Sequence, residues 1–198
     1  IGQPIAISEV MRVLKTFKAS LNDPDRPIAT LLFSGPTGVG KTATARTLAD
    51  QFFGDEKKLI RIDMSELQSP NQLEKLIGSS SGEPGILVQK LRERPFSVVL
   101  FDEIEKAAPI FFDMLLTVLD EGLLADSLGR ETDFRGSIII MTTNLGSKKG
   151  SSMGFSRQNI RNDTTAIRKF FRPEFFNRID QVVQFQPLSQ DSIYEIAK

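Results

Sequence analysis

The sequence predicts an α/β fold in which a mostly parallel, five-stranded central sheet is flanked by helices. Two observations carry this prediction. Short apolar strand candidates alternate along the chain with amphipathic helices, and a glycine-rich loop joins the first such strand to the next helix. Continuous apolar runs are typical of strands that are buried on both faces, as in parallel sheets. With 198 residues, of which 40% are hydrophobic and 25% charged, the chain is expected to form one main globular domain.

The elements follow from the spacing of apolar residues and from turn residues. Strands are expected at Ala29 to Phe33, Leu59 to Asp63, Ser97 to Asp102, Ser137 to Thr142 and Gln181 to Phe185. Helices are expected at Ile7 to Leu21, Lys41 to Phe53 and Pro109 to Glu121, and a last one from Gln190 to Lys198. Leu123 to Arg135 is interpreted as a hairpin or ordered loop, and Lys148 to Asp163 as a mobile surface loop. Because the chain begins without Met and ends inside a helix, we expect it to be part of a longer protein.

Composition restricts the chemistry. The chain has no Cys and no His, which excludes disulfides, thiolate metal ligands and the usual imidazole base. Catalysis must therefore use carboxylates, Lys, Arg and hydroxyl groups. The 25 basic residues equal the 25 acidic ones, so no overall positive field favours binding to nucleic acid or to an anionic membrane. No apolar run is long enough to cross a bilayer and no signal-peptide pattern is present, which predicts a cytoplasmic protein.

A phosphate-binding loop is predicted between the first strand and the helix after it. Its residues are Gly35, Pro36, Thr37, Gly38, Val39, Gly40, Lys41 and Thr42, which fit the pattern Gly-x-x-x-x-Gly-Lys-Thr. In such a loop, backbone N–H groups surround phosphate oxygens, the lysine contacts the terminal phosphates and the threonine binds magnesium. The alternative is a glycine-rich turn with an exposed lysine, but the position between a buried strand and a helix favours the phosphate-binding interpretation.

Asp102 and Glu103 end the third strand candidate, at the edge where open parallel sheets bind ligands. Such a pair is more often a helix cap or a solvated turn. Together with a phosphate loop, however, it predicts that Asp102 orients magnesium and that Glu103 activates the attacking water. The sequence therefore predicts hydrolysis of a nucleoside triphosphate. The Asn-Lys-x-Asp signature of a GTPase is not found, which favours ATP.

Three further polar residues are candidates for roles at this site. Asn144 follows the fourth strand candidate and could orient the water or the terminal phosphate, or it could simply form a turn before Gly146. Arg172 and Arg178 flank the helix-like segment Pro173 to Asn177. Each could be an arginine finger, although charged residues at helix ends are usually only solvated.

The combined motifs resemble the AAA+ ATPases, specifically the second ATPase module of the Clp unfoldases and disaggregases. The matching stretches are Gly35 to Thr42, Leu59 to Glu66, Ser97 to Lys106, Gly129 to Arg135, Met141 to Ser147 and Phe171 to Asp180. The resemblance implies a three-layer P-loop NTPase fold, with the AAA+ large subdomain at residues 1–187 and the start of a truncated small helical subdomain at 188–198. It also makes Ile1 and Gly2 part of the adenine pocket, and Ala43, after Thr42, a further nucleotide contact.

For the chemistry, the resemblance implies a Mg²⁺-dependent ATPase with Thr42 and Asp102 as metal ligands and Glu103, Asn144 and Arg178 as catalytic residues. Asn144 would sense the terminal phosphate, and Arg178 would reach the site of a neighbouring subunit. The implied partners are further copies of the chain in a hexameric ring and protein substrates, with a partner peptidase left open. No nucleic acid and no membrane are expected as partners.

One loop departs from the family pattern. Where the unfoldases carry a Gly-Tyr-Val-Gly-like pore loop, Leu76 to Gly85 is shorter and contains no aromatic residue. The aromatic is thought to grip the threaded polypeptide, so we favour a plain connecting loop here. Two functions stay open: a motor module that unfolds or remodels proteins, and an assembly or switch ATPase that remodels a partner complex without threading it.

Overall fold

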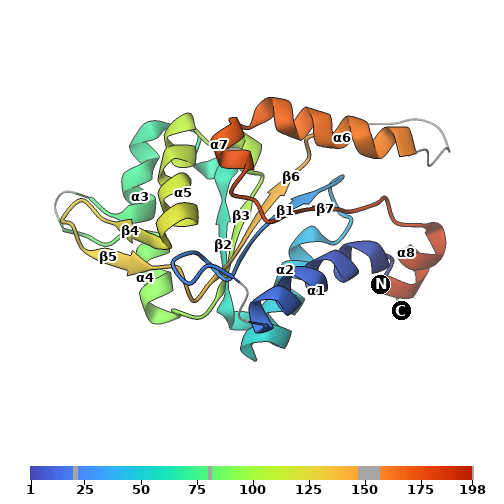
Figure 1. Ribbon diagram of the computed structural model, residues 1–198, viewed down its shortest axis with the longest axis horizontal. Helices are drawn as coiled ribbons and strands as arrows, with labels where there is room; N and C mark the ends of the chain where they lie inside the picture. The colour runs from blue at the N-terminus through green and yellow to red at the C-terminus, as the bar shows by residue number, and fades with distance from the viewer. Residues whose placement is uncertain (20–21, 80–81, 147–156, 198) are drawn as a thin grey trace.

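The computed structural model describes residues 1–19, 22–79, 82–146 and 157–197, and it has a five-stranded sheet in the middle of the molecule (Figure 1). Its strands are β1 (Ala29–Ser34), β2 (Leu59–Asp63), β3 (Val98–Asp102), β6 (Ile138–Thr143) and β7 (Gln181–Gln184). Their order in the sheet is β2-β3-β6-β1-β7, and every neighbouring pair is parallel. The predicted α/β fold and its parallel sheet are thus confirmed.

Helices cover both faces of the sheet (Figure 1). Successive residues of a strand point to opposite faces, so Leu31 and Phe33 enter one apolar core while Leu32 enters the other. The first core contains α1 (Pro4–Lys18) and α2 (Lys41–Phe53); the helices that contribute to the second are α3 (Leu73–Ile77), α4 (Ile86–Glu93), α5 (Pro109–Glu121), α6 (Arg157–Phe170) and α7 (Pro173–Phe176). The result is the three-layer arrangement that the sequence predicts.

Several short elements complete the chain. Strands β4 (Leu123–Ala125) and β5 (Glu131–Asp133) form a separate antiparallel hairpin, which confirms the hairpin expected there. Helix α8 (Gln190–Ile196) follows β7, and four 3₁₀ turns lie at Glu56–Lys58, Met64–Glu66, Pro70–Gln72 and Ile104–Lys106. The division of the chain after residue 187 stays a prediction. Among the described residues, no helix is both long and apolar enough to cross a membrane.

Two expected elements need correction. Helix α1 begins at Pro4 rather than Ile7, because a proline is well suited to the first turn, where its missing N–H is not needed. The surface loop predicted for Lys148 to Asp163 is wrong from Arg157 onward, where α6 begins. The first half of α6 is mostly polar and has few apolar residues at helical spacing, so its sequence resembles that of a loop. The part of the predicted loop up to residue 156 lies outside the described residues.

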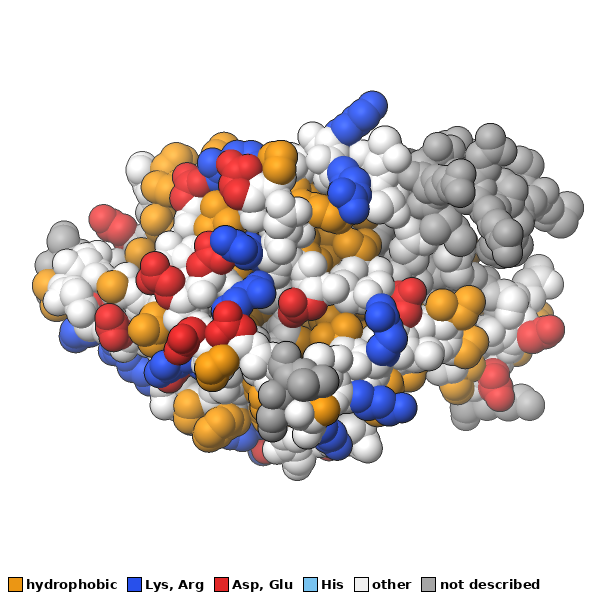
Figure 2. Space-filling model, viewed as in Figure 1, with side chains coloured by type: hydrophobic (Ala, Val, Ile, Leu, Met, Phe, Trp, Pro, Cys, Tyr) orange, Lys and Arg blue, Asp and Glu red, His pale blue; other side chains and the backbone are white. Residues whose placement is uncertain are grey.

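Acidic and basic side chains are interspersed over the face of the molecule drawn in Figure 2. This distribution agrees with the equal numbers of basic and acidic residues in the chain, 25 of each. On the described part of that face, the positive side chains do not form one continuous area.

Candidate functional site

The phosphate loop connects β1 to α2 at the carboxyl edge of the sheet. Gly40 precedes the helix with a φ of 105°, a left-handed conformation that glycine adopts without strain. Gly35 is needed for a close approach, since a Cβ added there would lie 2.5 Å from the Phe185 carbonyl oxygen after β7. Helix α2 starts at Lys41, so its first N–H groups have no acceptor within the helix and can bind an anion.

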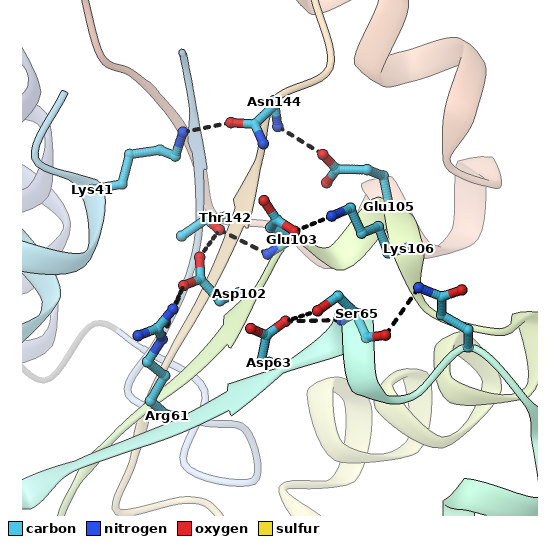
Figure 3. Close-up of polar contacts among 11 residues, drawn as sticks. Lys41, Arg61, Asp63, Ser65, Asp102, Glu103, Glu105, Lys106, Thr142 and Asn144 are labelled. Atoms are coloured by element: carbon cyan, nitrogen blue, oxygen red, sulfur yellow. Dashed lines mark hydrogen bonds and ion pairs between the residues drawn. The ribbon is translucent and has the colours of Figure 1, made fainter. Parts of the chain in front are cut away.

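Lys41 is the centre of the polar contacts at this loop. Its Nζ donates hydrogen bonds to the carbonyl oxygens of Gly35 and Pro36, the latter at 2.9 Å. A third bond, of 3.0 Å, goes to Oδ1 of Asn144 (Figure 3). Burial lowers the pKa of the ammonium group, and the nearby carboxylates, first among them that of Asp102, partly oppose this. Lys41 is thus a buried donor. A phosphate oxygen bound at the loop would compete for its ammonium group with the three oxygens that accept its hydrogen bonds in this structure.

Asn144 lies just beyond the end of β6, as predicted, and its side chain points to Lys41. Its backbone N–H donates to Oε1 of Glu105 at 3.0 Å. The other oxygen of Glu105, Oε2, is buried and has no hydrogen-bond partner within the described structure. Glu105 therefore holds the backbone that carries the Asn144 amide, and a role for Asn144 beyond that of a turn former stays a prediction.

Asp102 and Glu103 lie at the end of β3, and the hydroxyl of Thr142 on the neighbouring strand links them. Thr142 Oγ1 donates to Oδ1 of Asp102 and accepts the backbone N–H of Glu103 at 3.0 Å (Figure 3). Glu103 has a φ of 57° and is the only non-glycine residue with a positive φ in the described chain. Such a conformation costs about 1–3 kcal/mol and persists where the surroundings impose it, commonly at functional sites.

Basic side chains neutralise both carboxylates. The guanidinium of Arg61 on β2 binds Oδ2 of Asp102, with Nη2 at 2.6 Å and Nε at 3.0 Å. Lys106 forms an ion pair of 2.5 Å with Oε2 of Glu103, one turn further along the chain. A hydrogen bond to Glu103 raises the pKa of Lys106. Each carboxylate is thus paired with a basic side chain at the carboxyl edge of the sheet.

The residues at this edge fit a magnesium ion. Thr42 supplies a hydroxyl in the first turn of α2, and the Asp102 carboxylate, which is 8% exposed, is already paired with a cation, Arg61. Hydroxyl and carboxylate oxygens are the ligands that Mg²⁺ prefers. Within the described ranges, no group of three or more acidic side chains could hold an ion alone.

The N-terminus contacts the phosphate loop through Gln3. Its Nε2 donates to the Val39 carbonyl at 3.2 Å and to that of Gln186 at 2.7 Å, and its Oε1 accepts the N–H of Gln186. Gly2 and Gln3 line a pocket of about 290 Å³ between α1 and β7. Ile1 is 70% exposed and does not line this pocket, and the expected contacts of Ile1 and Gly2 with adenine stay a prediction. Gln3 thus joins the N-terminus to the phosphate loop and to the segment that follows β7.

Both finger candidates lie along α5. Arg172 pairs with Asp113, and Arg178 pairs with Asp120, two turns further along the same face of the helix. Arg178 precedes β7, at the edge of the sheet where the strands begin, whereas Lys41 lies where they end. At about 3.3 Å per residue, β1 from Thr30 to Gly35 spans about 16 Å, too far for an arginine side chain. Arg178 thus does not join the site of its own chain.

The structure adds residues that motif reasoning did not single out. They are Gln3, Arg61, Glu105, Lys106 and Thr142. One signal was present for Arg61: on a strand, residues two apart share a face, so Arg61 lies on the same face as Asp63, which pairs in register with Asp102. The contacts of Thr142 and Gln3 depend on which strands become neighbours, which no local pattern reveals.

Comparison with known proteins agrees with this geometry. A family model described as "AAA domain (Cdc48 subfamily)" matches residues 26–182. The "ATP-dependent Clp protease ATP-binding subunit ClpA homolog" of Porphyra purpurea is 43% identical over 217 residues, covering 100% of this chain and 26% of that protein. The "Chaperone protein ClpB" of Meiothermus ruber is 46% identical, covering 100% and 24%. The "ATP-dependent Clp protease ATP-binding subunit ClpC" of Staphylococcus aureus is 43% identical, covering 99% and 26%.

The chain spans about a quarter of the length of these relatives, as the covered shares of 26%, 24% and 26% show. The family match, in contrast, extends from before β1 to the second residue of β7 and includes the phosphate loop, the acidic pair and Asn144. All the strands of the central sheet fall within it or begin in it. The chain therefore belongs to the AAA domain family, in which the Clp ATPase subunits and chaperones are its relatives.

Proposed function

We propose that this chain binds ATP with Mg²⁺ and hydrolyses it to ADP and phosphate. The observation that carries the proposal is the convergence of four side chains at one edge of the sheet. Lys41 bonds Asn144 across 3.0 Å, and the Thr142 hydroxyl joins Asp102 to the backbone of Glu103 (Figure 3). The names of the ClpA and ClpC relatives as ATP-binding subunits support the choice of ATP.

In the proposed reaction, each residue has a separate task. The loop N–H groups and Lys41 bind the phosphates, and Thr42 with Asp102 would hold the metal ion, which neutralises charge on the transferring phosphoryl group. Glu103 accepts a hydrogen bond from the attacking water and increases its nucleophilicity. In this structure Oε2 of its carboxylate forms an ion pair of 2.5 Å with Lys106, so we assign the bond with water to Oε1. Asn144 orients the terminal phosphate or the water.

We further propose that Arg178 completes the site of a neighbouring subunit in a homo-oligomeric, six-membered ring. Two observations support this. Arg178 lies at the opposite edge of the sheet from the phosphate loop of its own chain. Its side chain is 44% exposed, and its partner Asp120 is 38% exposed, so the ion pair is weak and the guanidinium can be released toward another molecule.

For this proposal we predict that Arg178→Ala, in the assembled full-length protein, lowers kcat by about 1,000-fold or more while ATP still binds, because the finger neutralises charge that develops only in the transition state. Steady-state ATPase rates and binding of a fluorescent ADP analogue measure the two effects. Arg172→Ala is the matched control, since Arg172 pairs with Asp113 on the same helix face. If Arg172→Ala inactivates the ring and Arg178→Ala does not, Arg172 is the finger.

We propose that the work done by this ATPase is the remodelling or unfolding of proteins, as the name "Chaperone protein ClpB" of one relative suggests. One observation favours the alternative, a switch that changes partner complexes without threading. Near the two ends of the segment expected at a pore, Gly78 pairs with Pro84. The segment is bonded to the β4–β5 hairpin, through Arg130 to the Gly82 carbonyl at 3.2 Å and Ser127 to the Gly78 carbonyl at 3.2 Å. Its described residues carry no aromatic side chain.

A fluorescence experiment separates the two functions. If the protein is a threading motor, the full-length ring with ATP should abolish the fluorescence of a tagged green fluorescent substrate, because threading destroys its fold. The Glu103→Gln ring, which binds ATP without turnover, is the control for passive binding. Persisting fluorescence in the active ring, together with ATP-dependent dissociation of a partner complex, would assign the switch function instead.

A further inference from the structure

The carbonyl oxygen of Arg178 is bonded by a second arginine, Arg26, which lies just before β1. Arg26 donates from Nη2 to the Arg178 carbonyl at 3.0 Å and from Nε to the Leu119 carbonyl at 2.8 Å. Leu119 is in the last turn of α5, where carbonyl groups lack N–H donors within the helix and attract cations. One guanidinium thus fixes the backbone at Arg178 to the end of α5.

The same helix end also holds the Arg178 side chain. Its Nε pairs with Asp120, the residue after Leu119. The side-chain pair is partly exposed and can open. The bond from Arg26 to the Arg178 carbonyl is also exposed, whereas the bond from the same guanidinium to the Leu119 carbonyl is partly buried. The bond to Leu119 therefore holds the Arg26 guanidinium beside the Arg178 carbonyl independently of the pair between Arg178 and Asp120.

A third contact fixes the chain after Arg178. Asp180 donates its backbone N–H to the Thr30 carbonyl at 2.9 Å, and its Oδ2 accepts the Thr30 N–H at 2.7 Å. Arg178 thus lies between two anchors, Arg26 and Thr30, both on the segment that leads through β1 to the phosphate loop. The packing that places Arg26 is close: a Cβ added at Gly122, after α5, would lie 2.7 Å from the Asp25 carbonyl oxygen.

The chemistry of Arg26 points to positioning rather than charge pairing. Within the described residues, its side-chain hydrogen bonds go to two carbonyl oxygens and not to a carboxylate. A planar guanidinium presents donors in a fixed fork that can bridge two acceptors, which a lysine ammonium on a flexible stem does poorly. We propose that Arg26 is a positioning residue for Arg178, and that it controls ATP hydrolysis in the neighbouring subunit rather than in its own. This inference rests on the proposed role of Arg178 as a finger acting between subunits.

Mixed rings of the full-length protein test the inference. Arg26→Met keeps a stem of similar length but removes the donors, and we expect kcat to fall by roughly tenfold or more with unchanged nucleotide binding. Arg12→Met is the matched control. Arg12 and Arg26 line one surface pocket of about 360 Å³, but the Arg12 side chain bonds Gln181 and not the Arg178 carbonyl. Arg12→Met should retain wild-type turnover. Arg26→Lys should recover only part of the lost rate.

The decisive readout is mixing with Glu103→Gln subunits, which are inactive but carry an intact finger. In rings assembled at random from equal amounts of the two variants, about half of the Arg26→Met subunits have a Glu103→Gln neighbour that supplies an intact Arg178. The turnover per Arg26→Met subunit should therefore rise to about half of the wild-type rate per subunit. A merely destabilised subunit would not be recovered in this way. Turnover of Arg26→Met equal to that of Arg12→Met would overturn the inference.

Arg178→Ala, mixed with Glu103→Gln subunits in the same way, distinguishes a failure of the proposed role of Arg178 from a failure of the proposed role of Arg26. If mixing restores Arg178→Ala but not Arg26→Met, the finger acts between subunits and Arg26 does not position it. If mixing fails to restore Arg178→Ala, the finger does not act between subunits, and both the proposed role of Arg178 and the inference about Arg26 are wrong.

Discussion

Glu103→Gln is expected to lower kcat for ATP hydrolysis by roughly 100- to 10,000-fold, the range attributed to a positioned general base. The amide has the size of the carboxylate but cannot accept the proton of the attacking water. ATP binding should persist, because Lys41 and the loop that bind phosphate are untouched. The backbone N–H of Glu103, whose φ is 57°, is held by the Thr142 hydroxyl, and the substitution leaves this bond in place. Phosphate release and ATP binding, measured on the same protein, give both quantities.

The matched control is Glu121→Gln, the same chemical change at an exposed position at the end of α5. It should leave turnover within the error of the assay. Turnover of Glu103→Gln near the wild-type rate would move the water-activating role to another group. Glu105 would then be examined first, since its Oε2 is buried without a hydrogen-bond partner in the described structure.

Lys41→Ala is expected to weaken ATP binding by roughly 100-fold, which corresponds to about 2.7 kcal/mol. The substitution removes a buried ammonium that reaches the loop carbonyls and Asn144. It also removes the positive charge that offsets the repulsion between phosphate and the carboxylates of Asp102, Glu103 and Glu105. Titration with a fluorescent ATP analogue measures the dissociation constant, and Lys15→Ala, an exposed lysine on α1, is the control.

The effect on stability should differ from the effect on binding. Burial lowers the pKa of Lys41, which means that the nucleotide-free protein holds this charge at a cost. We therefore expect the unfolding temperature of nucleotide-free Lys41→Ala to be no lower than that of the wild type. At an ATP concentration near the dissociation constant of the wild type, ATP should raise the unfolding temperature of the wild type clearly more than that of Lys41→Ala. A nucleotide-dependent rise in Lys41→Ala as large as that in the wild type would contradict the proposed role of the lysine.

Local sequence patterns were sufficient for most of the fold. The helices Lys41–Phe53 and Pro109–Glu121 have the predicted bounds, as does β2 (Leu59–Asp63). Each has a local cause, such as Gly40 before α2, Gly54 after it or Gly122 after α5. The start of α6 was missed because its first half is polar and carries little apolar periodicity.

The sequence by itself determined the parallel sheet, the phosphate loop and the placement of Asp102, Glu103 and Asn144 at strand ends, because these depend on contiguous residues. Only the tertiary structure decided which side chains support them. Thr142 meets Asp102 across 40 positions of sequence, Arg26 meets Arg178 across 152 and Gln3 meets Gln186 across 183. Such contacts depend on the order of strands in the sheet and on the packing of helices, and each supporting residue type is common elsewhere on protein surfaces and in cores. The physical reason is that a motif encodes local geometry, whereas a hydrogen bond between distant segments exists only after the core has brought them together.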